Sequence, residues 1–171
     1  MIVKAGGIIA VFIVCVATGF IKSYSLSKRV RELESFLSAL SLISTEIRYF
    51  ASPTDVIISK LAFANEYVKL RVFEFCKANL EQTRDFTSAW GGAIDKAKPF
   101  LSLDKDDIEA LTGFGGTFGT TDTQGQLANC ERYSELLRQR LESAREDKTK
   151  RGRMYSSLGV LAGVFFALIL Y

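Results

Sequence analysis

The chain has 171 residues and a formal net charge of +3, which fits one compact domain and does not suggest nucleic-acid binding. It contains no histidine, the commonest general base and metal ligand, and only three widely spaced cysteines. Neither a disulfide framework nor a zinc site fits that pattern, so we expect buried free thiols in a reducing cytosol.

The first predicted element is an apolar helix at the N-terminus. Residues 5–21 carry no charge, and at 1.5 Å per residue they span about 26 Å, close to the hydrocarbon thickness of a bilayer. A cleaved signal peptide is the rival interpretation. The basic residues that follow resist translocation and mark a cytoplasmic flank; they are Lys22, Lys28, Arg29 and Arg31. We therefore predict a transmembrane helix over residues 1–21.

A long helix is predicted next. Apolar residues recur at steps of three and four between residues 30 and 50, with no proline before them, so one helix runs on from the first span. Pro53 ends it, because proline disfavours helix in the preceding residue and suits a first helical position. Ser52 is then expected to cap a second helix reaching about Phe63, with Asp55 placed for a capping-box contact.

Three shorter helices follow in the predicted order. They cover residues 67–80, residues 85–96, and a stretch that begins with Ser102 or Asp104 as its cap and extends to Phe118. We find no stretch with convincing period-two alternation, so no strand is predicted.

The last predicted helix is capped within residues 121–123 and has one apolar face over residues 127–144. It continues into residues 154–171, a short but plausible second span. Basic residues precede this span too, namely Lys148, Lys150, Arg151 and Arg153. The positive-inside rule therefore places residues 22–153 in the cytoplasm between two membrane helices, 1–21 and 154–171. The predicted fold class is all-α, a bundle of about six helices whose two long members enter the membrane.

A glycine-rich stretch over residues 113–119 invites a nucleotide-loop interpretation. Its spacing is not G-x-G-x-x-G, no lysine followed by serine or threonine completes a P-loop, and no predicted strand precedes it. Close approach of a neighbouring helix explains Gly115 and Gly119 better, and Gly119 can also end the helix. Phosphate binding and a partner surface remain the alternatives.

Acidic residues gather at the start of the fifth predicted helix, and they resemble the first half of a calcium loop: Asp104, Asp106, Asp107 and Glu109. The loop glycine and the closing glutamate are missing, and acids at a helix N-terminus are favoured by the helix dipole. We find no catalytic centre, no metal cluster and no cofactor motif, and we predict that the protein is not an enzyme.

Small residues four apart occur in both predicted spans, at Gly6 and Ala10 and at Gly159 and Gly163. Such pairs favour helix packing, within one chain or between chains. The Lys/Arg clusters at 22–31 and 145–153 are typical of membrane flanks and suit anionic lipid.

Short sequence pieces also occur in a characteristic order over almost the whole chain. They are Thr18-Gly19-Phe20, Glu46-Ile47-x-Tyr49 followed by Pro53, Phe73-Glu74, Ala89-Trp90, Phe114-Gly115-x-x-Phe118-Gly119-x-x-Asp122 followed by Gln126, and Leu158-Gly159-x-Leu161-Ala162-Gly163. In this order they resemble the stage III sporulation protein AB family of endospore-forming bacteria. The family usually has leucine at the positions of Phe118 and Thr54.

The resemblance implies a role in the mother-cell membrane machinery that connects with the forespore through a channel. The family is similar to the cytoplasmic domain of the platform protein of type II secretion and type IV pilus systems. The expected partners are a secretion-type ATPase of the same operon, other channel membrane proteins, the lipid bilayer and a second copy of the chain. The candidate interaction or structural residues are Glu46, Tyr49, Pro53, Phe114, Gly115, Gly119, Asp122 and Gln126.

Three points stay open at this stage. Glu46, Arg48 and Tyr49 could form a partner patch or an internal polar network. A membrane-anchored signalling or sensor module that acts through dimerisation is the alternative function. An exported enzyme with a cleaved signal is a more remote third.

Overall fold

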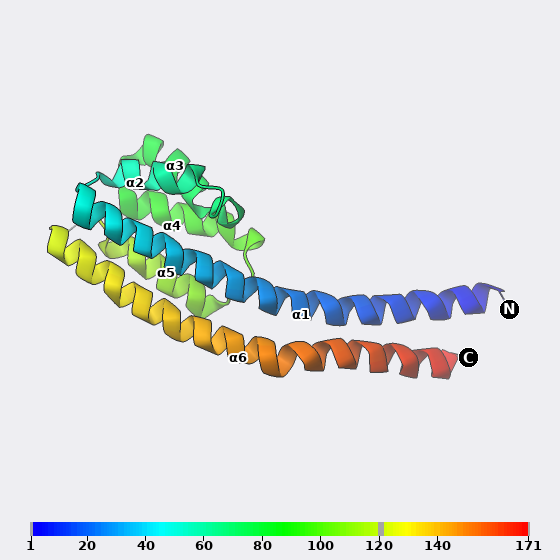
Figure 1. Ribbon diagram of the computed structural model, residues 1–171. Coiled ribbons are helices and arrows are strands. Elements are labelled where there is room, and N and C mark those ends of the chain that lie inside the picture. The colour runs from blue at the N-terminus through cyan, green and yellow to red at the C-terminus, as the bar shows by residue number, and fades with distance from the viewer. Residues whose placement is uncertain (1, 120–121, 171) are drawn as a thin grey trace. The chain divides into compact units, whose positions relative to one another are not determined.

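The computed structural model describes residues 2–119 and 122–170, although the side chains of residues 2–12, 156, 159, 163 and 166–170 lie outside that description. Throughout the described residues the chain is helical, with six α-helices and no strand (Figure 1). The all-α prediction is therefore confirmed. The chain divides into two compact units: unit 1 contains residues 1–30 and 143–171, and unit 2 contains residues 31–142.

The helices follow one another with short connections. In chain order they are α1 (Ile2–Thr45), the π-helical turn η1 (Glu46–Phe50), α2 (Thr54–Phe63), the 3₁₀ turn η2 (Val68–Leu70), α3 (Val72–Thr83), α4 (Phe86–Ala97), the 3₁₀ turn η3 (Lys98–Phe100), α5 (Lys105–Thr117) and α6 (Thr123–Leu170). The long helices α1 and α6 each contribute to both units.

Unit 2 is a helical bundle with an aromatic core. In it, α3 packs against α2 and α4, and α4 packs against α5, while buried residues of α1 and α6 such as Leu33 and Leu137 complete the core. Ring centroids 5.0–6.2 Å apart connect Phe36, Phe73, Phe86, Trp90, Phe114 and Phe118. Burial of these rings stabilises the packing of the short helices.

Two predicted helix starts are confirmed by their caps. Asp85 accepts a hydrogen bond from the backbone N–H of Ser88, 2.9 Å away, at the start of α4. Asp104, rather than Ser102, caps α5, and Asp107 completes a reciprocal capping box with it.

Two local predictions are wrong. Ser52 does not cap α2: Pro53 stands at the cap position, and the Ser52 hydroxyl donates to Glu46 instead. The single helix predicted over residues 67–80 is interrupted at Arg71, whose left-handed backbone (φ 57°) separates η2 from α3. The side chain of Arg71 lies over the rings of Phe75 and Phe100, at 5.0 and 4.3 Å, and this contact helps to offset the strain.

Unit 1 consists of the two end segments of the chain. They approach each other closely, because a Cβ atom on Gly152 would lie 3.5 Å from Oγ of Ser23. Arg29 also reaches Asp147 across the helix pair, with 3.5 Å between Nη1 and Oδ2. These contacts place α1 and α6 side by side within one chain in this unit (Figure 1).

The predicted membrane spans stay a prediction. Among the described residues, no helix reaches both the length and the apolar content that crossing a bilayer requires. Residues 1–12 and 166–171, which form much of the two predicted spans, lie outside the described side chains. The same is true of the four predicted packing positions, Gly6, Ala10, Gly159 and Gly163.

Candidate functional site

Most of the predicted interaction residues lie near one end of unit 2, which we call the turn end. There α2, α4 and α6 begin and α3 and α5 finish. One pocket is lined by residues at or beside the connections that lead into α2, α4 and α6, including Thr54, Arg84 and Gly119. These three connections therefore lie close together. The turn end therefore joins segments that are far apart in the sequence.

The turn η1 is the most unusual backbone feature of the turn end. Over Glu46–Phe50 the helix widens to π geometry, and Ala51 then adopts a left-handed backbone with φ 46°. Short π segments occur frequently at functional sites. Here the turn presents two aromatic rings to solvent: Tyr49 is 72% exposed and Phe50 is 66% exposed.

A buried carboxylate holds this turn. Only 8% of the Glu46 side chain is exposed, and its Oε2 accepts hydrogen bonds from Nζ of Lys60 at 2.6 Å and from Oγ of Ser52 at 2.8 Å. These bonds, that from Lys60 first, lower the pKa of Glu46 below its ordinary value, although burial acts in the opposite direction. Glu46 is therefore part of an internal polar network that ties η1 to α2, whereas Tyr49 faces outward.

We define the aromatic patch as Tyr49, Phe50 and Val56, all of which are exposed. Lys60 joins the patch to the network beneath it, because its Nζ lies 5.6 Å from the centre of the Phe50 ring. Val56 lies one helical turn before Lys60 on α2. An exposed apolar cluster on a turn fixed by buried polar contacts is typical of a protein-binding surface.

The Glu46 network predicts a pH dependence of stability. A lowered folded-state pKa means that the carboxylate stabilises the fold fully above the unfolded-state value near 4.5, and that this contribution is lost as the pH falls through the folded-state pKa. Glu46→Gln should therefore lower the urea midpoint at pH 7, and its difference from the unchanged protein should shrink below about pH 4.5. Urea titrations at a series of pH values measure this; an equal difference at pH 7 and pH 3.5 would contradict it.

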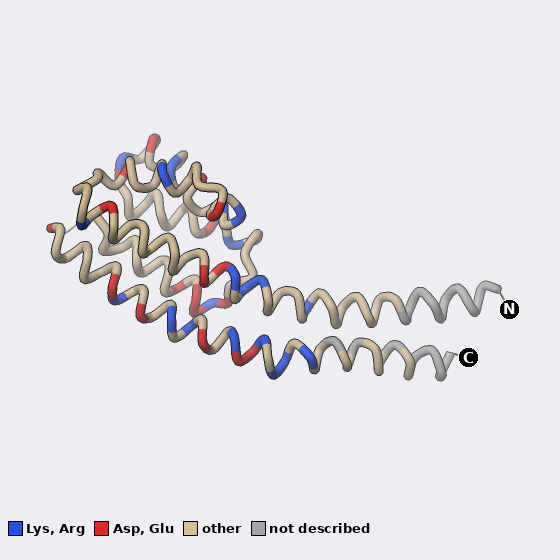
Figure 2. Tube along the Cα trace, in the orientation of Figure 1, with Lys and Arg blue, Asp and Glu red and all other residues tan. Residues whose placement is uncertain are grey.

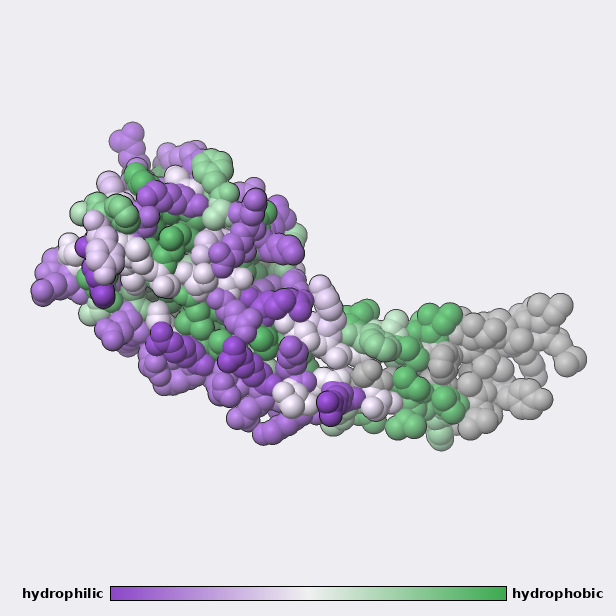
Figure 3. Space-filling model, in the orientation of Figure 1, coloured by the Kyte–Doolittle hydropathy of each residue, from purple (hydrophilic) through white to green (hydrophobic). Residues whose placement is uncertain are grey.

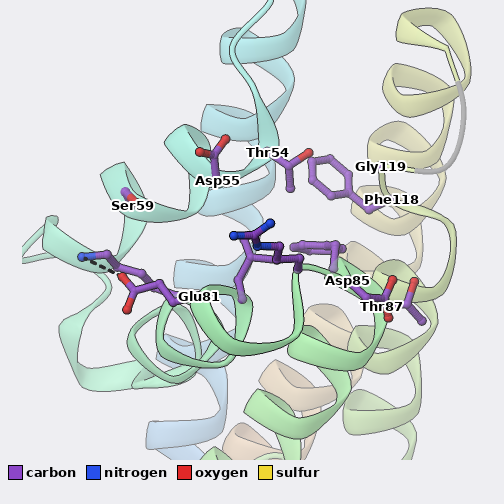
Figure 4. A pocket seen from close by; sticks show the side chains of 12 residues that line it. Thr54, Asp55, Ser59, Glu81, Asp85, Thr87, Phe118 and Gly119 are labelled. Carbon is purple, nitrogen blue, oxygen red and sulfur yellow. Dashed lines mark ion pairs between the residues drawn. The ribbon is translucent and has the colours of Figure 1, made fainter.

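A pocket of about 630 Å³ opens at the turn end (Figure 4). Its twelve lining residues are Thr54, Asp55, Ser59, Lys77, Leu80, Glu81, Arg84, Asp85, Phe86, Thr87, Phe118 and Gly119. Two of its charges are already paired, since Nζ of Lys77 lies 4.0 Å from Glu81. The lining contains hydroxyls, carboxylates and cations, but no thiol or imidazole.

The glycines of the 113–119 stretch have different structural roles. A Cβ atom on Gly115 would overlap Cδ1 of the buried Trp90, so α5 and α4 approach closely at this position, as the packing interpretation predicts. Gly119 lies beyond the end of α5 with φ 81°, a helix-ending conformation that glycine adopts most easily. Close approach of a neighbouring helix therefore explains Gly115 but not Gly119, which ends the helix instead.

The remaining predicted residues have structural roles or positions in the helices of unit 2. Asp122 accepts a hydrogen bond from the N–H of Gly125 at 2.8 Å and so caps α6, while Gln126 lies in the first turn of that helix. Phe114 is buried against Trp90. Of the acids in the calcium-like run, Asp106 pairs with Arg140 at 2.9 Å, and the described residues include no group of three potential metal ligands.

Sequence reasoning missed Lys60 and the actual role of Ser52. A signal did exist, because Glu46 lies in the apolar stripe between Ile43 and Ile47, and a buried acid needs a partner. Nothing in the spacing shows that this partner lies fourteen residues further along the chain.

Comparisons with known proteins agree with the fold. The model of the family "Stage III sporulation protein AB" matches residues 4–171. Stage III sporulation protein AB of Bacillus subtilis (strain 168) is 29% identical over 168 residues, covering 94% of this chain and 96% of the relative. A solved structure of a stage III sporulation protein AB (SpoIIIAB) has a similar fold, with a TM-score of 0.61 at 24% identity over 72% of this chain and 98% of that chain. The resemblance predicted from the motif order is confirmed, and the chain belongs to the stage III sporulation protein AB family.

Proposed function

We propose that this protein is a non-enzymatic, membrane-attached platform of a sporulation-specific, secretion-like channel complex between mother cell and forespore. In this proposal the aromatic patch at the turn end docks a secretion-type ATPase of the same operon. The observation that carries the proposal is the exposed π-helical turn with two outward rings, which is tied to α2 by the ion pair between the buried Glu46 and the half-exposed Lys60. The family membership supports the sporulation context.

The energetics of the turn support a docking role. A buried carboxylate stabilises a protein weakly at best, and exposed aromatic rings contribute little to the core. Neither feature is therefore explained by the stability of the protein alone. Both are explained if a partner covers the rings, because aromatic side chains are enriched among the residues that dominate binding energy. A turn that is already ordered also lowers the entropy cost of association.

The test uses the full-length protein in detergent and the ATPase encoded in the same operon. The double variant Tyr49→Ala/Phe50→Ala should weaken the complex at least about 30-fold, since one hot-spot ring contributes about 2 kcal/mol or more. Phe63→Ala is the matched control, because Phe63 is equally exposed, at 74%, on the last residue of α2. Sedimentation velocity or light-scattering titration measures the dissociation constant.

The outcomes are distinct. Equal affinities for the double variant and the control would contradict docking at the aromatic patch. No complex with the unchanged protein would contradict the platform proposal itself. A change in self-association instead, without any ATPase binding, would favour the signalling or sensor alternative.

Membrane attachment, with unit 2 in the cytoplasm, needs a separate test. The native thiols of unit 2 cannot report it, because Cys76 and Cys130 are buried and burial raises the pKa of Cys76 to about 12. A Lys69→Cys variant places a thiol on an exposed residue of η2. In intact cells a membrane-impermeant maleimide should leave this thiol unlabelled until the membrane is opened; labelling of intact cells would contradict the proposed topology.

A further inference from the structure

The charges of the chain are strongly segregated between the two units. Unit 1 contains nine basic and two acidic residues, a net charge of +7, whereas unit 2 contains thirteen basic and seventeen acidic residues, a net charge of −4. The overall charge of +3 conceals this difference. In Figure 2 the basic residues of unit 1 follow one another along the α6 segment and recur on α1.

The two acids of unit 1 are already engaged by basic residues. Asp147 lies 3.5 Å from Arg29 and 3.1 Å from Arg151, and Glu146 lies 2.9 Å from Lys150. Three other cations are exposed and have no ion-pair partner among the described residues: Lys22, Lys148 and Arg153. We call these three residues the basic girdle.

The girdle residues come from both helices of unit 1 at nearly the same level. Gly152 lies against Ser23, so their neighbours Arg153 and Lys22 occupy one level of the helix pair. Lys148 is five residues from Arg153, about 7.5 Å along the helix axis. That spread matches the thickness of one phospholipid headgroup layer, about 5–8 Å.

Exposed apolar side chains continue directly from the girdle on both helices. They are Phe20, Ile21, Met154, Leu158 and Leu161, and the described part of this surface is largely hydrophobic in Figure 3. A nucleic acid or an acidic protein offers anions but no adjoining hydrocarbon layer. A bilayer offers phosphates and acyl chains in this order, which is why we choose it as the occupant.

We propose that Lys22, Lys148 and Arg153 bind the phosphates of anionic phospholipids and make the protein select these lipids over zwitterionic ones. The inference rests on the proposed membrane attachment and adds a lipid class to it. Choline or ethanolamine headgroups carry a cation that repels the girdle, whereas phosphatidylglycerol does not. Each girdle residue should therefore favour the anionic lipid, by up to about fivefold.

The experiment measures lipid binding to the full-length protein in neutral detergent by native mass spectrometry, with equal amounts of phosphatidylglycerol and phosphatidylcholine. The unchanged protein should carry several-fold more phosphatidylglycerol. The variant Lys22→Gln/Lys148→Gln/Arg153→Gln should lose at least about fivefold of that preference. The control Lys69→Gln/Lys98→Gln/Lys105→Gln removes the same charge from exposed residues of unit 2 and should keep it.

Each outcome has a defined meaning. Equal binding of both lipids to the unchanged protein, or an equal loss in the control variant, overturns the girdle. A loss of DNA binding in the girdle variant without a change in lipid preference also overturns it, in favour of a nucleic acid. Insertion into phosphatidylcholine vesicles without lipid preference leaves membrane attachment intact, whereas failure to insert into any vesicle overturns both. ATPase docking is unaffected by these results, because it is measured in detergent at unit 2.

Discussion

Trp90→Ala should lower the free energy of unfolding by about 3–5 kcal/mol, the largest single effect that we expect in this protein. Trp90 is 2% exposed and contacts the rings of Phe73, Phe86 and Phe114. Its Nε1 also donates a 2.7 Å hydrogen bond to the carbonyl of Leu111. Alanine would remove these contacts and leave a cavity between α4 and α5. Urea titration of the full-length protein, followed by far-ultraviolet circular dichroism, measures the change.

Two further variants serve as comparisons for the Trp90→Ala result. Trp90→Phe keeps most of the apolar contact and loses the hydrogen bond, so we expect an intermediate loss of about 1–2 kcal/mol. Tyr49→Ala removes an exposed ring and should change stability by less than about 0.5 kcal/mol. A loss for Trp90→Ala as small as that for Tyr49→Ala would show that the aromatic core does not hold unit 2 together.

Gly115→Ala should destabilise unit 2 by about 1–3 kcal/mol, the usual range for overpacking a core. The added methyl group would overlap Cδ1 of Trp90, and the rings of Phe86 and Phe114 restrict the movement of Trp90 away from it. Either the Trp90 side chain leaves its rotamer or α5 moves away from α4. The measurement is the same urea titration.

The neighbouring glycine provides a matched control in the same helix. A Cβ atom on Gly116 would have no neighbour within 4 Å, so Gly116→Ala should stabilise α5 by about 0.5–1 kcal/mol. Gly115→Ala should also cost less in a Trp90→Phe background, because the smaller ring leaves room for the methyl group. Equal effects at the two glycines, or an unchanged cost in the double variant, would contradict the close approach of α4 and α5.

Local signals predicted many of the helix boundaries in unit 2. Helix periodicity and capping residues depend on a few neighbouring positions, so the helix starts near residues 85, 104 and 122 could be predicted before the fold was known. The break at Arg71 could not be predicted in this way. Its left-handed backbone is accompanied by contacts to Phe75 and to Phe100, twenty-nine residues away, and no local propensity reports such a distant contact.

The candidate site was predicted only in part. The motif order selected Glu46, Tyr49 and Gly119, and the structure places all three near the turn end. It did not separate the buried Glu46 from the exposed Tyr49, because the wider π turn changes the direction in which successive side chains point. Lys60, which fixes the turn, was not among the candidates.

The sequence by itself determined the all-helical class, the family, several helix boundaries and the concentration of basic charge beside the two apolar ends, because each is a property of composition or of short-range spacing. Only the tertiary structure decided which partner neutralises Glu46, which glycine lies against Trp90, and which cations of unit 1 remain without an acidic partner among the described residues. These are contacts between segments distant in the chain. Their free energy depends on packing and desolvation in three dimensions, which the order of residues along one helix does not specify.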